Sequence, residues 1–269
     1  MATNAKKLTI ISAGQSNIDG RVPSSKLPAY LSLPLAGCHY CSDKTPQHEQ
    51  GIFQDELKES DLSDHRWGFD LITYYYLLHQ SDCQDLHVIK WTEGGTSIDP
   101  TGDGDNHWTT HFDELADRSH SLLLGFTNLI KTCQQTQHNH LDIKAMLWHQ
   151  GEADRASYSK VAAENYYQNL KDVFAYCRQV VGNPELPIIC GTVSHNSKQY
   201  DAQVEKATIQ VASEDPNIHL IDMQNGQLLD DFHFNAASSE LFGKRVYNTL
   251  IDEQIVTGKR LADITAHVY

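Results

Sequence analysis

The sequence predicts an α/β fold in three layers (α/β/α), in which helices cover both faces of a doubly wound, five-stranded parallel sheet. Two observations predict it. Five short runs consist mainly of β-branched or apolar residues, which is typical of strands buried on both faces. Segments with helical periodicity separate these runs, and this alternation indicates a parallel sheet built from right-handed crossovers.

The five apolar runs place the strands along the chain. They cover residues 7–12, 86–91, 143–148, 186–193 and 218–223. The carboxyl ends of parallel strands lie along one edge of a sheet, and ligands bind there beside the point at which the strand order reverses. We therefore expect the functional residues directly after these runs.

The segments between the strands predict five helices, at residues 67–80, 109–134, 157–181, 201–212 and 236–252. The clearest is the third, where apolar residues recur at spacings of three and four and form one stripe. Thr110 and Asp113 have the spacing of a capping box for the second helix, and Asn235 can cap the last one.

The 269 residues are predicted to form a single domain, because no repeat, low-complexity tract or linker divides them. Residues 20–66 interrupt the alternation of strands and helices. This segment is rich in Pro, Ser, Asp and His and is longer than an ordinary connection. We therefore expect a functional loop or an insertion there.

An excess of acidic residues excludes several classes of function. With 21 Lys and Arg against 35 Asp and Glu, the chain carries a formal charge of −14, which opposes binding to nucleic acid and to anionic membrane surfaces. No apolar run is long enough to span a membrane. The chain enters its first strand without the apolar core of a signal peptide. As given, it is expected to be cytoplasmic, or a mature fragment of a secreted or periplasmic protein.

The six cysteines and 15 histidines form no recognisable metal motif. The "CHYC" sequence at residues 38–41 lacks a second pair of ligands, and no His-Glu-x-x-His pattern is present. We therefore expect neither a metal nor a cofactor, and the chemistry must come from side chains. The sequence sets no oligomeric state.

A serine follows the first strand. Ser16 lies between Gln15 and Asn17, with glycines at positions 14 and 20 that allow a sharp turn into a helix. A serine hydroxyl acts as a nucleophile only when a base removes its proton and donors stabilise the resulting oxyanion. Ser16 can fill that role or can simply cap the helix.

A candidate base follows the fifth strand. Asp230 precedes His233 by three residues, so its carboxylate can accept from Nδ1 and leave Nε2 to face a serine. The adjacent Asp231 can substitute for Asp230, although the three-residue offset favours Asp230.

Candidate oxyanion donors follow the second and third strands. Gly94 and Gly95 let the backbone approach a reacting group closely, with an N–H free to point at it. Gln150 offers a neutral side-chain amide, whereas Glu152 and Asp154 in the same polar cluster are expected to accept hydrogen bonds around it.

Four motifs make the chain resemble the SGNH hydrolase superfamily and, within it, the acetylesterases of carbohydrate esterase family six and the sialate O-acetylesterases. They are "GQSN" (14–17), "GGTS" (94–97), "WHQGEAD" (148–154) and "DFHF" (231–234), the last preceded by Asp230. The resemblance runs from residue 7 to about residue 250 and implies the flavodoxin-like fold of that superfamily. It implies that Ser16 is the nucleophile, His233 the base and Asp230 its orienting partner. It also implies an oxyanion hole formed by the N–H groups of Ser16 and Gly95 and the side chain of Gln150.

The resemblance predicts a serine esterase that removes O-acetyl groups from a small carbohydrate through an acyl-enzyme. The expected substrate is an acetylated xylan-type oligosaccharide or an O-acetyl sialic acid. The alternatives are a thioesterase or lipase-like acylhydrolase of the same superfamily, and a carbohydrate-binding protein without turnover. Six further residues are expected to support the site or contact substrate: Gln15, Asn17, Arg21, Gly94, Glu152 and Arg155. Either arginine can bind a substrate carboxylate or form a structural ion pair, and Glu152 can brace His233 or Gln150 or contact the substrate.

Overall fold

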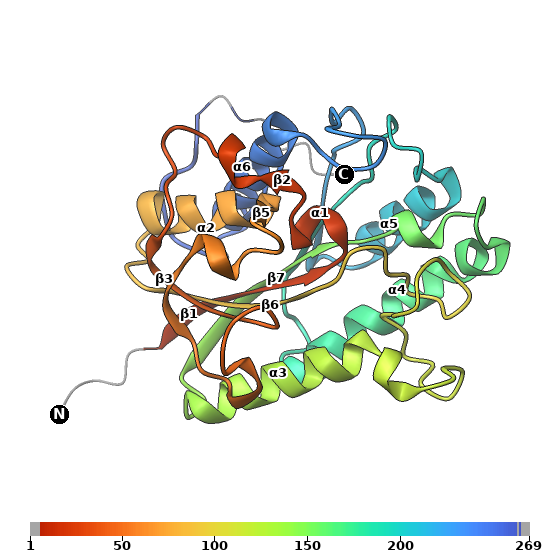
Figure 1. Ribbon diagram of the computed structural model, residues 1–269, viewed down its shortest axis with the longest axis horizontal. Helices are drawn as coiled ribbons and strands as arrows, with labels where there is room; N and C mark the ends of the chain where they lie inside the picture. The colour runs from red at the N-terminus through yellow and green to blue at the C-terminus, as the bar shows by residue number, and fades with distance from the viewer. Residues whose placement is uncertain (1–5, 263, 265–269) are drawn as a thin grey trace.

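A computed structural model of the protein describes residues 6–262 and 264. In this part of the chain the central sheet has seven strands in the order β4-β3-β6-β1-β7-β8-β9 (Figure 1). The five predicted strands are confirmed as β1 (Lys7–Gly14), β6 (Leu86–Thr92), β7 (Leu141–His149), β8 (Ile188–Gly191) and β9 (Ile218–Ile221). They pair in parallel, which confirms the predicted fold class.

The sheet has two more strands than the five predicted, because residues 20–66 also contribute to it. They contribute β3 (Leu35–Ser42), which is parallel to β6, and β4 (Gln54–Leu57), which pairs antiparallel with β3 at the edge. Glycine, histidine and cysteine interrupt the apolar pattern of β3, and β4 is mostly polar, so neither resembles a buried run.

The remainder of this segment forms short elements. β2 (Val22–Pro23) and β5 (Arg66–Trp67) make a separate two-stranded sheet. The described residues also contain 3₁₀ helices at Ser24–Lys26, His48–Gln50, Glu59–Asp61, Arg118–His120 and Glu152–Asp154.

The strand order places the functional edge of the sheet. The chain leaves β1 to build the β6 side and returns to lay β7 against the other side of β1. The carboxyl ends of β1 and β7 therefore flank the point at which the strand order reverses, where such sheets bind ligands.

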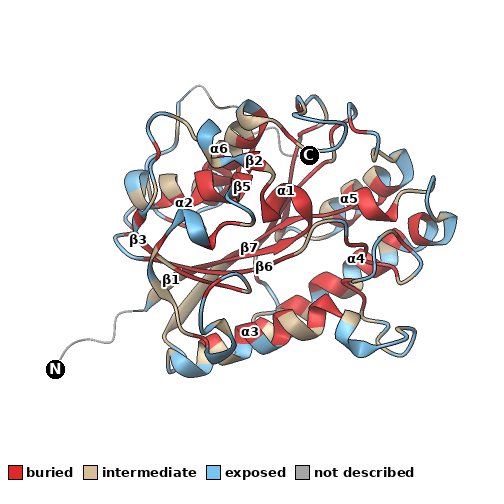
Figure 2. Ribbon diagram, in the orientation of Figure 1, coloured by how far each residue is buried: buried red, intermediate tan, exposed pale blue. Residues whose placement is uncertain are grey.

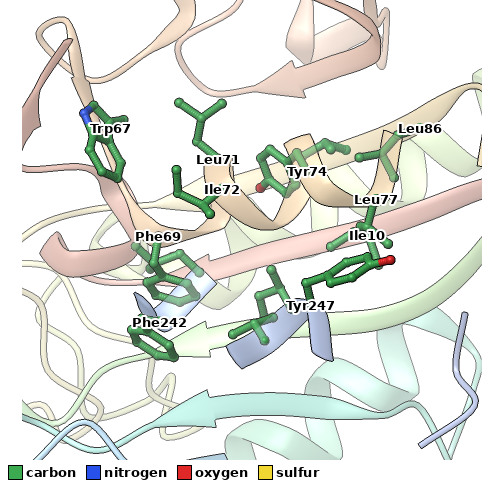
Figure 3. Close-up of a cluster of buried hydrophobic side chains, with 14 of the residues drawn as sticks. Ile10, Trp67, Phe69, Leu71, Ile72, Tyr74, Leu77, Leu86, Phe242 and Tyr247 are labelled. Carbon is green, nitrogen blue, oxygen red and sulfur yellow. The ribbon is translucent and has the colours of Figure 1, made fainter. Parts of the chain in front are cut away.

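Helices cover both faces of the sheet (Figures 1 and 2). One face carries α2 (Phe69–Gln80) and α6 (Ala236–Asp252), and the other carries α3 (Leu122–Thr136), α4 (Lys160–Val181) and α5 (Ala202–Glu214). On the first face the rings of Phe69 and Phe242 stack with centroids 3.8 Å apart, which joins α2 to α6 (Figure 3).

The first residues of α6 and α3 test the two predicted helix caps. The Asn235 side chain accepts from the Ser238 N–H at 3.0 Å and caps α6, as expected. The capping box at Thr110 and Asp113 was wrong, because α3 begins at Leu122 and Ser121 is its cap. The preceding residues carry few apolar side chains, so they have no stripe with which to pack a helix against the sheet.

Candidate active site

The turn after β1 presents Ser16. At Gly14 the backbone has φ +128° and approaches the His149 carbonyl too closely for any side chain, and the Gln15 N–H donates to that carbonyl at 2.8 Å. The short helix α1 (Ser16–Asp19) follows, and Ser16, at its first position, is 4% exposed. Neither the Ser16 N–H nor the Gly95 N–H donates a hydrogen bond to another residue within 6–262 and 264.

A buried lysine that no sequence motif identified supports α1. The Lys90 ammonium donates to the carbonyls of Ile18 (2.6 Å) and Asp19 (3.2 Å), and it forms an ion pair with Asp70 at 2.8 Å. Lys90 stands inside the otherwise mainly apolar run 86–91, and a buried cation needs partners. Its place in the sequence could therefore have indicated these contacts.

The Asp19 carboxylate holds the end of the same turn. It accepts from Ser63, Thr92 and Arg21 at 2.6–3.0 Å. Burial alone would raise the pKa of Asp19, but the charges of Lys90 and Arg21 and the hydrogen bonds from Arg21 and Thr92 lower it below its ordinary value. Charged groups, namely Lys90, Arg21 and Asp19 itself, therefore hold the turn that carries Ser16.

The candidate base is paired with Asp230. The Asp230 carboxylate lies 2.8 Å from the His233 Nδ1, and its other oxygen accepts from the N–H groups of Phe232 and His233, each at 2.8 Å. Burial would raise the pKa of Asp230, but these hydrogen bonds lower it, so the carboxylate stays ionised at neutral pH. Asp231 instead binds Lys198 at 2.6 Å.

One hydrogen bond joins the base segment (residues 229–234) to the nucleophile turn (residues 14–19). The Phe234 N–H donates to the Asn17 Oδ1 at 3.0 Å, and these two residues directly follow His233 and Ser16 in the chain. The Ser16 hydroxyl and the His233 ring share no hydrogen bond within the described residues. Catalytic hydrogen bonds of this kind commonly tighten only when substrate binds.

Gly94 lies against both the nucleophile and an arginine. A side chain at this position would collide with the Arg21 guanidinium and would approach the Ser16 Cβ to 3.3 Å, so only glycine leaves room for these two residues here. Arg21 forms an ion pair with Asp19 at 2.6 Å through Nη1. Gly95 has φ +75° and faces open space.

Gln150 is buried at the end of β7 with its amide engaged. It donates to the Thr96 carbonyl (3.1 Å) and to Asp154 (2.6 Å), and it accepts from the Tyr166 hydroxyl at 2.9 Å. The bond to Thr96 ties the loop of Gly94 and Gly95 to the motif at 148–154, and the bond to Asp154 lies within that motif. The oxyanion role of Gln150 stays a prediction.

Asp154 binds the same loop through its backbone. Its carboxylate accepts from the N–H groups of Ile98 and Asp99 at 2.9–3.2 Å, in addition to Gln150. Asp154 is completely buried, and burial raises its pKa to about 7 despite these hydrogen bonds.

Glu152 and Arg155 have structural contacts. Glu152 accepts from the Asn17 side chain at 2.9 Å, and no described hydrogen bond joins it to His233 or Gln150. Arg155 donates to the Glu152 carbonyl at 3.0 Å and pairs with Asp103 at 2.8 Å. Of the alternatives left open for Arg155, the structure therefore contains the ion pair.

Other features lie apart from these residues. A cavity of about 880 Å³ opens at the opposite edge of the sheet, lined by residues such as Leu8, His39 and His87. Within the described residues, no group of three or more His, Cys, Asp or Glu side chains is arranged to hold a metal ion, and no helix is long and apolar enough to cross a membrane.

Comparison with protein families gives one match over most of the chain. Residues 6–252 match the family described as carbohydrate esterase, sialic acid-specific acetylesterase. Among curated proteins, none is similar enough to count as a relative.

Several solved structures share the fold. A protein from Arabidopsis thaliana superposes with a TM-score of 0.70 at 18% identity, covering 92% of this chain and 98% of that one. A carbohydrate acetylesterase from Xanthomonas citri gives 0.60 at 12% identity, covering 90% of this chain and 55% of that one. The protein NanS gives 0.56 at 14% identity, covering 93% and 98%.

Proposed function

Because the chain belongs to the carbohydrate esterase family of sialic acid-specific acetylesterases, and is therefore a carboxylic ester hydrolase, we propose that it removes O-acetyl groups from sugars by serine catalysis. Ser16 is the nucleophile, His233 the base and Asp230 the partner that orients the base. The observation that carries this assignment is the 2.8 Å contact between Asp230 and the His233 Nδ1, in a segment hydrogen-bonded to the residue after Ser16.

In the first step the Ser16 Oγ attacks the carbonyl carbon of the acetyl group, and the His233 Nε2 takes its proton. Asp230 accepts from Nδ1, which fixes the tautomer and stabilises the imidazolium. The N–H groups of Ser16 and Gly95 stabilise the oxyanion. The bond from the carbonyl carbon to the sugar oxygen then breaks, and His233 returns the proton to that oxygen, which releases the sugar.

The second step reverses these roles with water. His233 removes a proton from a water molecule that attacks the acetyl-Ser16 ester, and the same two N–H groups stabilise the second oxyanion. The bond to the Ser16 Oγ breaks and His233 returns the proton to it. Acetate leaves and the free serine is restored.

We infer that the substrate is an O-acetyl sialic acid or an acetylated xylan-type oligosaccharide. Acetate release from both substrates, with fatty-acid release from a long-chain ester as a control, tests this inference. We expect release from at least one sugar and little from the long-chain ester. Turnover of the long-chain ester alone would favour the lipase-like alternative.

A chelator tests the reaction type in the same assay. Serine catalysis through Ser16 and His233 requires no metal ion, so acetate release should be unchanged in EDTA. Loss of activity in EDTA, with recovery on adding a divalent metal ion, would refute the serine mechanism.

A further inference from the structure

Asn17 is the residue at which three motifs of the site meet. Its side chain is 6% exposed and uses both ends of its amide. Nδ2 donates to Glu152 Oε1 at 2.9 Å, and Oδ1 accepts from the Phe234 N–H at 3.0 Å. The partners are 135 and 217 residues away in the chain, so this one side chain joins the turns after β1, β7 and β9.

The chemistry of the partners fixes the direction of the amide. A carboxylate oxygen accepts a hydrogen bond from an amide NH₂, and a backbone N–H only donates. Turning the Asn17 amide over would set its oxygen against Glu152 and its NH₂ against the Phe234 N–H. The Glu152 carboxylate therefore holds Oδ1 toward the segment that carries His233.

The base segment has no other described hydrogen bond to the nucleophile turn. Its internal bonds are local, such as the Leu229 N–H to the His233 carbonyl at 2.8 Å. Its remaining outward bonds run to Ser197 and Lys198, after β8. Besides the packing of the buried Phe234 ring, the hydrogen bond from the Phe234 N–H to Asn17 is therefore the described contact that ties the segment of the imidazole to the turn of the serine.

We propose that Asn17 is a positioning residue that sets the placement of His233 relative to Ser16, and that Glu152 fixes the orientation of the Asn17 amide. This inference rests on the proposed function, in which His233 is the base. A base displaced by about 1 Å costs on the order of 100-fold in rate, so the consequence is measurable.

Reversing the hydrogen bond tests the contact. In Asn17→Asp two carboxylates face each other in a buried site, and we expect kcat on an acetylated sugar to fall about 100-fold with little change in KM. In the double variant Asn17→Asp/Glu152→Gln, the amide introduced at position 152 can donate to the carboxylate introduced at position 17. The other oxygen of that carboxylate can still accept from the Phe234 N–H, so we expect this variant to recover at least tenfold over Asn17→Asp. No recovery would overturn the proposal.

Combining the Asn17 variant with a His233 variant distinguishes a positioning role of Asn17 from a general loss of stability. If Asn17 acts through His233, Asn17→Asp should add less than a threefold loss in a His233→Ala background, measured on an activated acetate ester. A full additional loss would show that Asn17 acts elsewhere, and would refute the inference while the assigned base stands. If instead His233→Ala alone retained more than a tenth of the activity, the proposed function would fail first.

Asn248 provides a matched control. It is also buried, donates to the Leu261 and Ile264 carbonyls and accepts from the Leu261 N–H, all far along the chain from the site motifs. Asn248→Asp should lower the melting temperature with turnover near that of the native protein. If Asn17→Asp fails to fold, Glu152→Ala replaces it in the His233→Ala background with the same expected coupling, because it removes the acceptor that orients Asn17.

Discussion

At the scale of single residues, the two adjacent aspartates before His233 have different surroundings. Asp230 is folded back onto His233 and onto two N–H groups of its own turn, whereas Asp231 points to the ammonium of Lys198. The structure thus separates two carboxylates that sequence spacing alone could only rank.

This difference predicts opposite outcomes for the two Asn variants. Asp230→Asn should lower turnover by about 10⁴-fold, because the amide no longer holds His233 in the required tautomer. Asp231→Asn should change turnover little, since only an exposed ion pair is lost. Rates of acetate release from both purified variants check this. Near-normal turnover at 230 with severe loss at 231 would reverse the assignment.

Gly94 predicts a steric effect. In Gly94→Ala the new methyl group would occupy the position of the Arg21 guanidinium, beside the Ser16 Cβ. We expect Arg21 to move and turnover to fall about 100-fold, because small displacements at a reacting group are costly. Gly182→Ala, at the end of α4 with open space around it, is the control and should affect stability alone. Equal turnover in the two variants would contradict the predicted steric effect at Gly94.

At the scale of elements, the turn of α1 depends on β6 and α2. Lys90 in β6 neutralises Asp70 at the start of α2 and binds the last carbonyls of α1. The ion pair lies in the interior, where a charge left without its partner is strongly unfavourable.

Lys90→Met should therefore lower the free energy of unfolding by about 3–5 kcal/mol, since it leaves the Asp70 carboxylate buried without its cation. Denaturant unfolding measures the loss. The double variant Lys90→Met/Asp70→Asn removes both charges and should recover part of it. A single variant as stable as the native protein would show that this pair does not support α1.

Asp154 links the loops after β6 and β7 and makes stability depend on pH. Its pKa is raised from 3.8 to about 7 by burial, so the folded chain holds this proton more tightly than the unfolded chain. The contribution of Asp154 to stability is therefore greatest below the unfolded value and is lost as the pH rises from 3.8 to about 7.

Unfolding of the native protein and of Asp154→Asn across this range measures the effect. Relative to the variant, the native protein should lose stability as the pH rises from about 4 to about 7, by at most about 4 kcal/mol. A difference between the two proteins that stays constant over the whole range would mean that Asp154 titrates normally.

At the scale of the whole molecule, the sequence predicted the parts of the sheet that local pattern determines. β1, β6, β7, β8 and β9 were found because each contains a run made mainly of apolar or β-branched residues. β3 and β4 were missed because pairing with β6 and with each other, rather than local composition, makes them strands.

The site, like the sheet, was predicted where a local pattern determines a contact and missed where distant segments meet. Spacing within one turn identified Asp230 and His233 as a pair, and their contact is present. The links from Lys90 to α1 and from Asn17 to Glu152 and Phe234 join residues 71 to 217 positions apart. Such contacts arise from the order of strands in the sheet, which brings the ends of β1, β7 and β9 together and leaves no periodic pattern in the sequence.

Every step of the proposed reaction requires that Ser16 accepts the acetyl group. The most direct measurement is the rate of acetate release by Ser16→Ala on the best acetylated sugar, with folding checked by thermal unfolding. We predict a folded protein whose turnover is lower by about a millionfold, because removal of the serine leaves only the oxyanion donors and binding. A folded variant that retains more than about a tenth of the native turnover would contradict the assignment of Ser16 as the nucleophile.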